Sequence, residues 1–396
     1  MLQGVFGQRI FWRNQGFAAL FVFTVLLGTA FAQTESILYS FVDVPDGKLP
    51  DATPILDAKG NLYGTTTSGG ATNHGTVFEL TSKGSETVLY SFAGSPDGQT
   101  PYTSGVVRDK AGNFYGTTGG GGANGQGIVF QLTPAGTEIV LHSFAADGKD
   151  GVLPIGGLVM DKAGNLYGTT NKGGTTNNGT VFKVTPGGVE TVLYSFAGGT
   201  ADGCQPYDVT LVLKKNTLYG TTFACGAKGG GTVFKVTLSG TETVLYNFPS
   251  NNVDGFQPAA GVILDKAGNL YGTTVGGGGA IGGIVFKVTP SGKETVLYAF
   301  NQTETDGYKP EAPVALDKLG NLYGTTLKGG TGSGCCGTVW KLDPTGKETI
   351  LHVFTGTPDG NALAGAGVVL DKKGNLYGTA FGGGAKGDGA VYKVVP

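Results

Sequence analysis

The stretch Gly164-Asn165-Leu166-Tyr167-Gly168-Thr169-Thr170 decides the fold, because close copies of it recur through the chain. The tyrosines of successive copies are separated by 52, 52, 52, 52, 52 and 54 residues. They are Tyr63, Tyr115, Tyr167, Tyr219, Tyr271, Tyr323 and Tyr377. A period of about 50 residues is typical of arrays in which each repeat is one supersecondary unit. We therefore expect seven copies of one structural unit.

Each repeat contains four short runs rich in β-branched and aromatic residues, bounded by Gly, Pro and Asp. The runs of the third repeat are residues 157–160, 165–170, 180–184 and 191–196. This composition predicts strands, and any helix would meet a glycine within a turn or two. Simple alternation along the fourth run places Val192, Tyr194 and Phe196 on one face.

The turns between the runs predict antiparallel hairpins. Residues 161–165 and 185–188 each hold a glycine where a three-residue hairpin needs a left-handed residue. Pro186 presets the backbone angle of its turn. In the fourth repeat Asn216 replaces the glycine, and Asn is the next best left-handed residue. We therefore expect the first run to pair with the second, and the third with the fourth.

Seven sets of four antiparallel strands predict an all-β fold, the seven-bladed β-propeller. The array opens with a fourth run at residues 37–41 and closes with a third run at residues 390–394. We expect these segments to pair, so that the N-terminal strand completes the last blade and closes the ring. Closure removes the exposed sheet edges of an open array. An open β-solenoid is the alternative, but its rungs are usually much shorter than these repeats.

The first 32 residues have the pattern of an export signal. Arg9 and Arg13 form a basic segment, residues 16–28 are apolar, and Ala30-Phe31-Ala32 supplies a small-x-small cleavage site. Cleavage after this site leaves residues 33–396 as one propeller domain, secreted or periplasmic and not held to a membrane. An uncleaved membrane anchor is the alternative, although the apolar run is short for a bilayer span of ~20 residues.

Composition excludes several classes of protein. Gly supplies 74 of the 396 residues, but no Gly-X-Y register runs through the chain, which excludes collagen. The formal net charge is −2, and the arginines are Arg9, Arg13 and Arg108. Nucleic-acid binding requires a basic stripe, so we expect no nucleic-acid partner. The glycine-rich loops lack the Lys-Ser/Thr ending of a phosphate-binding P-loop.

Three strings follow one another along the repeats: Gly-Asn-Leu-Tyr-Gly-Thr-Thr-x-x-Gly-Gly, Gly-Thr-Val-Phe-Lys-Val-Thr-Pro and Glu-Thr-Val-Leu-Tyr-Ser-Phe. On these strings the chain resembles the GloVer tandem-repeat family over residues 35–396. The resemblance implies an exported bacterial protein and carries no assigned activity. Members often end in a sorting or anchor tail, whereas this sequence stops at Pro396, so the resemblance does not imply surface anchoring here.

An Asp-Gly-x-x-Pro segment precedes the first run of each repeat and is the main candidate for a ligand site. Its aspartates are Asp46, Asp97, Asp150, Asp202, Asp254, Asp306 and Asp359, the last with Leu363 in place of the proline. The segment lies in one of the two longer loops, which should share the face opposite the tight turns. Asp capping a turn beside Gly is the simpler interpretation. A carboxylate ring binding Ca²⁺ or sugar hydroxyls is the alternative, although Ca²⁺ takes six to eight oxygens. We expect no other cofactor.

Nucleophilic catalysis has little support in the sequence. Of the three histidines, His142 and His352 occupy the tyrosine position of the fourth run, where a packed strand residue is the simplest interpretation. His74 lies in a loop without an evident nucleophile, and no Cys/His spacing indicates zinc. A glycosidase pair of carboxylates would be assembled only in space, and near-identical repeats argue against one unique pocket.

Cysteines mark the strongest departures from repeat symmetry. Cys204 precedes the fourth repeat's first run and Cys225 follows its second, both in loops expected on one face. Because export favours oxidation, we expect a disulfide between them. Cys335 and Cys336 form a vicinal disulfide or stay free. Four unpaired thiols are the remaining alternative.

These observations favour a monomeric, non-enzymatic propeller that binds a polysaccharide or a surface protein on its loop-rich face, by analogy with the fold alone. An extracellular carbohydrate lyase or hydrolase is the alternative. An enzyme would gather unlike polar residues at the mouth of the central channel and so break the sevenfold symmetry. A purely structural surface module is the third hypothesis.

Overall fold

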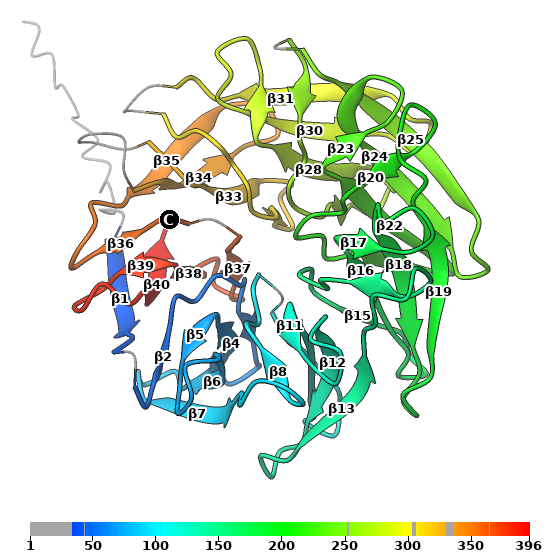
Figure 1. The fold of residues 1–396 in the computed structure, drawn as a ribbon. Coiled ribbons are helices and arrows are strands. Elements are labelled where there is room, and N and C mark those ends of the chain that lie inside the picture. The colour runs from blue at the N-terminus through cyan, green and yellow to red at the C-terminus, as the bar shows by residue number, and fades with distance from the viewer. Residues whose placement is uncertain are drawn as a thin grey trace, which may run out of the picture. The chain divides into compact units, whose positions relative to one another are not determined.

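The repeats form seven antiparallel sheets arranged as blades around a central axis (Figure 1). The computed structural model describes residues 34–396 apart from 43, 104, 252, 303–305, 330–335 and 364. The export signal predicted at residues 1–32 lies outside the described residues. Regular structure in the described part consists of strands, and no helix there is long and apolar enough to cross a membrane. The predicted seven-bladed β-propeller is confirmed.

Each blade runs outward as four strands, numbered here as blades 1 to 7 by their inner strands. The inner strands are β3 (Ile55–Leu56), β9 (Val107–Arg108), β15 (Val159–Met160), β21 (Val212–Lys214), β27 (Ile263–Leu264), β32 (Ala315–Leu316) and β37 (Val369–Leu370). The second strands are β4 (Leu62–Thr66), β10 (Phe114–Thr118), β16 (Leu166–Thr170), β22 (Thr217–Thr222), β28 (Leu270–Thr274), β33 (Leu322–Thr326) and β38 (Leu376–Ala380). The third strands are β6 (Thr76–Leu80), β12 (Ile128–Leu132), β18 (Thr180–Val184), β24 (Gly229–Thr237), β30 (Ile284–Val288), β34 (Thr338–Leu342) and β40 (Ala390–Val395). The outer strands are β7 (Glu86–Ser91), β13 (Glu138–Ser143), β19 (Glu190–Ser195), β25 (Glu242–Pro249), β31 (Glu294–Ala299), β35 (Glu348–Val353) and β1 (Thr34–Ser40).

The two longer loops of each repeat pair with each other, which confirms that they share one face. The paired strands are β2 (Gly47–Lys48) with β5 (Ser68–Gly69), β8 (Gly98–Gln99) with β11 (Gly120–Gly121), β14 (Gly151–Val152) with β17 (Lys172–Gly173), β20 (Gly203–Cys204) with β23 (Ala224–Cys225), β26 (Gly255–Phe256) with β29 (Gly276–Gly277), and β36 (Gly360–Asn361) with β39 (Gly382–Gly383). In blade 6 a single bridge between Tyr308 and Lys328 takes their place.

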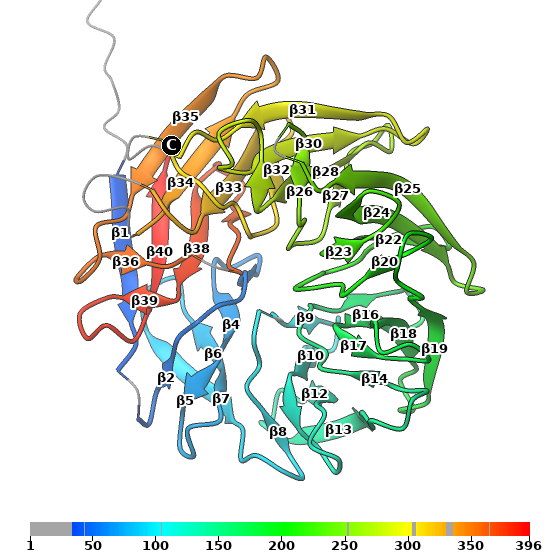
Figure 2. The same cartoon turned by 45° about the horizontal axis from the view of Figure 1, so that its top comes forward.

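The N-terminal strand closes the ring as predicted. β1 pairs antiparallel with β40, with Ile37 opposite Tyr392 and Ser40 opposite Ala390. The two strands, from opposite ends of the colour scale, lie side by side in Figures 1 and 2. The observed strand begins at Thr34, three residues earlier than expected. Blade 7 is therefore built from both ends of the described chain.

The core lies between neighbouring blades. An aromatic ring at or just beyond the end of each outer strand packs edge-to-face on an aromatic ring in the third strand of the next blade. The pairs are Phe41–Phe78, Phe92–Phe130, Phe144–Phe182, Phe196–Phe234, Phe248–Phe286, Phe300–Trp340 and Phe354–Tyr392. Such a pair contributes about 0.5–1.5 kcal/mol beyond its area burial. Each boundary between blades is thus stabilised by an equivalent contact.

The Leu-Tyr-Gly motif fits this packing. Leu166 packs toward the preceding blade and Tyr167 toward the following one, as the alternation of side chains predicts. Gly168 gives room to Phe182, because a Cβ at residue 168 would lie 2.6 Å from Cζ of that ring. The glycine is required by the close approach of the ring.

The outer strand departs from the predicted alternation. Val181 pairs with Tyr194 and the next pair moves to Val192, which leaves Leu193 as an extra residue. Leu193 and Tyr194 therefore both pack toward the next blade, together with Phe196. The expectation that Val192, Tyr194 and Phe196 share one face is wrong, because a β-bulge shifts the alternation by one residue.

The turn of the fourth blade also differs from the prediction. Lys214 pairs with Thr217, so this hairpin has a two-residue turn. The left-handed residue is Lys215, with φ 57°, and not Asn216. The prediction was wrong because it assumed the longer turn of blade 3, in which Gly164 has φ 85°.

Candidate functional site

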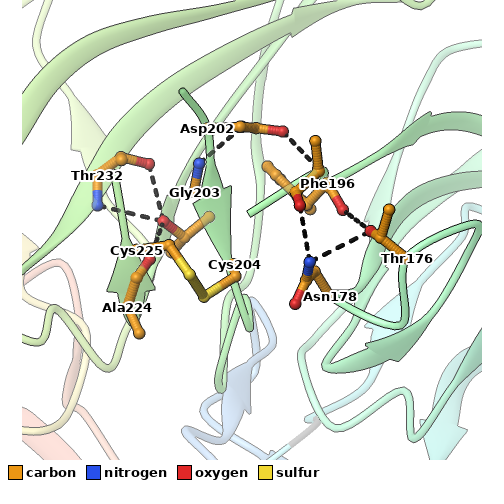
Figure 3. Close-up of a disulfide and its surroundings, with 11 residues drawn as sticks. Thr176, Asn178, Phe196, Asp202, Gly203, Cys204, Ala224, Cys225 and Thr232 are labelled. Atoms are coloured by element: carbon orange, nitrogen blue, oxygen red, sulfur yellow. Dashed lines mark hydrogen bonds between the residues drawn. A yellow bond between two sulfur atoms is a disulfide. The ribbon is translucent and has the colours of Figure 1, made fainter. Parts of the chain in front are cut away.

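The seven aspartates of the Asp-Gly segments lie one per blade, each in the loop that leads to the next blade. Asp202 accepts hydrogen bonds at Oδ2 from the Tyr194 hydroxyl (2.8 Å) and the Ala197 amide (2.7 Å). Its Oδ1 accepts from the Gly203 amide at 2.7 Å (Figure 3). Equivalent bonds to Oδ2 hold Asp46, Asp97, Asp150, Asp306 and Asp359. These bonds are those of a residue that shapes its own loop.

A glutamate from the next blade's outer strand faces each of these aspartates. Burial, and then the charge of Asp202, raise the pKa of Glu242 to about 7. Its Oε1 is buried without a hydrogen-bond partner. The same unpartnered oxygen recurs in Glu35, Glu86, Glu138, Glu190, Glu294 and Glu348. Two close carboxyl groups with one raised pKa hold one proton between them near neutral pH.

Two of these clusters contain histidine in place of tyrosine, at the outer-strand positions that the sequence predicted. His142 Nε2 lies 3.0 Å from Asp150 Oδ2, and His352 Nε2 lies 3.2 Å from Asp359 Oδ2. His74 lies in the loop between β5 and β6. In the described part of the chain, it joins no comparable group of ligand atoms.

The predicted disulfide between Cys204 and Cys225 is present, with Cα atoms 5.4 Å apart (Figure 3). It joins the two paired loops of blade 4, just before the segment that carries Asp208. Cys336 is buried. Cys335 lies outside the described residues, so the vicinal disulfide stays a prediction.

A cavity of about 290 Å³ lies at the centre of the ring and is lined by residues from all seven blades. Its lining is mainly apolar and includes Ile55, Leu158, Ile263 and Val314. Asp208 is the one acidic or basic residue in the described lining. A pocket of this kind, apolar with few polar groups, is the usual form of a small-molecule site.

Hydrogen bonds between blades define a ring of equivalent positions beside this cavity, of which Thr103, Asp208 and Gly365 line it. The Thr169 hydroxyl donates to the Val209 carbonyl of the next blade, and five other blades make the corresponding bond. The residue before each accepting carbonyl occupies a position that we call the mouth ring. Including blade 2, placed by sequence, the ring is Asp51, Thr103, Ile155, Asp208, Ala259, Glu311 and Gly365.

The mouth ring breaks the sevenfold symmetry, because only Asp51, Asp208 and Glu311 carry carboxyl groups. Asp208 is 6% exposed. Burial first, and then the charges of Asp51 and Glu311, raise its pKa well above the ordinary range. The hydrogen bond between the Thr103 hydroxyl and this carboxyl partly opposes the rise in pKa. The same hydroxyl donates to the Ile155 carbonyl at 2.8 Å.

Asp51 is the second carboxyl group of the mouth ring. Its Oδ1 accepts the Gly365 amide at 3.0 Å. Burial is the main cause that raises the pKa of Asp51 to about 7, and the charge of Glu311 adds to it. A Cβ at Gly365 would lie 2.8 Å from Asp208 Oδ2 and 2.0 Å from the Thr103 methyl group. Gly365 thus allows two carboxyl groups to approach one backbone position.

Two tyrosines flank these acids at the surface. Tyr102 is 40% and Tyr207 is 48% exposed. Burial is the main cause that raises the pKa of the Tyr207 hydroxyl, and the charge of Asp208 contributes next. Lys309 is close enough to lower the pKa of Glu311 partly, against the larger effect of burial. The mouth therefore combines carboxyl groups of raised pKa, phenol groups and an apolar cavity.

The site residues predicted from the sequence are the aspartates that recur in every repeat. The acids of the mouth ring do not recur and were not predicted. The mouth ring could have been found from one signal, the residue that changes type between otherwise similar repeats. Ile155 and Ala259 occupy it in blades 3 and 5, whereas Asp208 and Glu311 occupy it in blades 4 and 6. These residues come from different blades, and their side chains come close together only in the closed ring.

The fold and the site can be compared with known proteins. No curated protein matches the chain. Similar solved structures include a candidate gluconolactonase with 12% identity and a TM-score of 0.45, covering 92% of each chain. Another is a candidate 6-phosphogluconolactonase from Bacteroides uniformis with 13% identity and a TM-score of 0.48, covering 85% of this chain and 98% of that one. The profile of the Gloeobacter/Verrucomicrobia repeat matches residues 18–222 and 198–392. Because these two ranges span nearly the whole sequence, the chain belongs to the Gloeobacter/Verrucomicrobia repeat family.

Proposed function

We propose that this protein is an exported binding propeller that holds a polysaccharide at the mouth of its central cavity. The observation that carries the proposal is the mouth ring, where three unlike positions bring Asp51, Asp208 and Glu311 together beside Tyr102 and Tyr207. Protonated and ionised carboxyl groups donate and accept hydrogen bonds, as sugar hydroxyls do. The exposed tyrosine rings offer an apolar surface with a polar edge.

Export is part of the proposal. The basic and apolar segments before Ala32 support it. The disulfide between Cys204 and Cys225 also supports it, because disulfides persist in oxidising compartments. We place the protein in the periplasm or outside the cell, as a monomer.

Titration calorimetry of the purified protein against a panel of neutral and acidic oligosaccharides tests the binding function. One ligand per chain is expected, because the mouth ring is a single site, whereas the repeated rim aspartates would give up to seven. Asp208→Asn keeps a residue that tolerates the left-handed φ of 43° at this position. Glu311→Ala introduces the residue that blade 5 carries at Ala259. Both variants should weaken binding at least tenfold.

A matched control lies at the rim. Glu294→Gln changes a carboxyl group that faces Asp254, between blades 4 and 5, and should leave binding unchanged. If no oligosaccharide binds, the polysaccharide proposal fails, and a surface protein or a purely structural role takes its place. If the rim control loses binding equally, the mouth ring is not the binding site.

A carbohydrate hydrolase or lyase is the second candidate function. It is favoured by one observation: Asp51 and Asp208 both contact Gly365 and both have a raised pKa. Neighbouring carboxyl groups of this kind serve as general acid and base. Product analysis after long incubation with the bound oligosaccharide tests it. If the protein is an enzyme, the parent should form product and Asp208→Asn should not. If it is a binding protein, neither the parent nor the variant should form product.

A further inference from the structure

We propose that the protein binds Zn²⁺ at two sites on its rim, one formed by His142, Asp150 and Glu190 and the other by Glu35, His352 and Asp359. These sites are distinct from the mouth ring, and the inference does not depend on the proposed function. Each group offers one imidazole nitrogen and two carboxylate oxygens, and the ligand atoms all lie within 4.8 Å of one another.

The first site joins blade 2 to blade 3. His142 lies on β13, Asp150 in the loop that follows it, and Glu190 on β19. His142 Nε2 is 3.0 Å from Asp150 Oδ2. The charges of Asp150 and His142 both act on the Glu190 carboxyl, so the three groups face one another across the boundary. All three residues are partly exposed, which leaves a path for an ion from solvent.

The second site lies where the ring closes. His352 on β35 and Asp359 in the following loop belong to blade 6, and Glu35 lies on the closing strand β1. His352 Nε2 is 3.2 Å from Asp359 Oδ2. The Glu35 carboxyl is affected by the charges of both residues. A cation here would bridge the closing strand to the blade beside it.

An unpartnered glutamate oxygen is present at every boundary, but only at these two does an imidazole nitrogen lie beside it. Glu190 Oε1 and Glu35 Oε1 are buried and make no hydrogen bond. A buried acceptor without a partner is costly. A cation between the imidazole and the two carboxylates would coordinate these oxygens and offset the negative charge of the carboxylates.

The remaining blades show why histidine matters. At five boundaries the residue beside the Asp–Glu pair is tyrosine, as in Tyr194 with Asp202 and Glu242. A phenol that donates its proton to a carboxylate is a poor metal ligand, and the pKa of the Tyr194 hydroxyl is raised. A neutral imidazole presents a nitrogen lone pair instead. The same carboxyl pair therefore becomes a ligand set only at His142 and His352.

The donor set favours Zn²⁺ over Ca²⁺ and Mg²⁺. Three protein ligands of imidazole and carboxylate type, with water in the fourth position, match Zn²⁺ coordination. Ca²⁺ takes six to eight oxygens, which these clusters do not supply.

The test uses the chelator-stripped, full-length protein and Zn²⁺ alone, measured by titration calorimetry and by metal analysis after gel filtration. We expect two Zn²⁺ per chain. His142→Tyr and His352→Tyr should each leave one, and the double variant none. Tyrosine is the residue at this position in five blades, so the variants should keep the circular dichroism and the EDTA-treated melting temperature of the parent.

His74 provides the matched control. His74→Asn introduces the residue that blade 3 carries at Asn178, and it should leave both Zn²⁺ bound. Failure of the parent protein to bind Zn²⁺ would overturn the proposal. So would two retained ions in the double variant, or loss of binding in His74→Asn. Equal binding of Mg²⁺ or Ca²⁺ in the parent would overturn the assignment to zinc.

Discussion

The carboxyl pairs between blades predict that this propeller becomes less stable as pH rises from about 4.5 to about 7. Glu242 has an ordinary pKa of 4.5 in the unfolded chain and one of about 7 in the fold. The folded state therefore holds its proton more tightly than the unfolded state. The stability that this proton contributes is fully present below pH 4.5 and is lost as pH rises through the folded value.

The magnitude can be worked from this shift. A rise from 4.5 to about 7 corresponds at most to about 3.4 kcal/mol, since one pH unit is worth ~1.4 kcal/mol. Because Glu242 is only half-buried, solvent screening reduces this value, and we take roughly a third of it, ~1 kcal/mol. The variant Glu242→Gln carries a neutral amide at every pH. It should exceed the parent in free energy of unfolding by ~1 kcal/mol at pH 8 and match it near pH 4.5.

Combining the change at five boundaries makes the effect large enough for thermal denaturation. The glutamates that face a Tyr–Asp pair are Glu86, Glu138, Glu242, Glu294 and Glu348. Replacing all five by Gln should raise the free energy of unfolding at pH 8 by ~5 kcal/mol. With an unfolding entropy of ~2.1 cal/mol/K per residue, this is a rise in Tm of about 7 °C. Scanning calorimetry at pH 4.5 and pH 8 measures it.

A control of opposite sign tests the reasoning. Hydrogen bonds from Thr345 and from the Lys347 amide lower the pKa of Asp343, so its contribution is lost as pH falls, and Asp343→Asn should destabilise the fold at pH 8. A fivefold Gln variant that is less stable than the parent at pH 8 would refute the reasoning. A parent Tm that does not fall between pH 4.5 and pH 8 would also refute it.

Two further predictions concern the disulfide and the blade core. Cys204→Ala opens a loop with a sequence separation of 21 residues, which should cost about 3 kcal/mol in chain-entropy terms. The free energy of unfolding from urea denaturation should fall by this amount from the oxidised parent to the variant, and no loss would contradict the prediction. Gly168→Ala would place a methyl group 2.6 Å from the Phe182 ring and should cost about 1–3 kcal/mol by overpacking. Gly187→Ala is its control, because a Cβ there would lie 3.9 Å from the Thr185 hydroxyl oxygen, an ordinary contact distance, and its cost should stay under about 0.5 kcal/mol.

The sequence was sufficient for the architecture because each blade is a local structure. The spacing of the Leu-Tyr-Gly motif gave the number of blades, and the phase of the runs predicted the pairing of residues 37–41 with residues 390–394. Local rules also supported the hairpins and the disulfide. They failed where one residue was added or removed, at the bulge of Leu193 and at the two-residue turn of Lys215.

The mouth ring was beyond sequence reasoning for a different reason. Asp51 and Asp208 are separated by three blades along the chain, and only the radial geometry of the closed ring brings both to Gly365. The interblade carboxyl pairs were missed in the same way. Glu190 has no sequence relation to Asp150 that marks them as neighbours, and their contact depends on how one blade stacks on the next.

The closing strand has a consequence for the order in which the molecule can assemble. β1 pairs with β40, so the first described strand has no partner in its own sheet until the last repeat has been made. Six blades can form their hairpins as the chain lengthens, but the seventh must join segments some 350 positions apart. Contacts of such long sequence separation form slowly. Until they form, β40 presents an open edge to which the first strand of a second molecule could add, and the rate of closure therefore sets how long each chain is open to exchange with its neighbours.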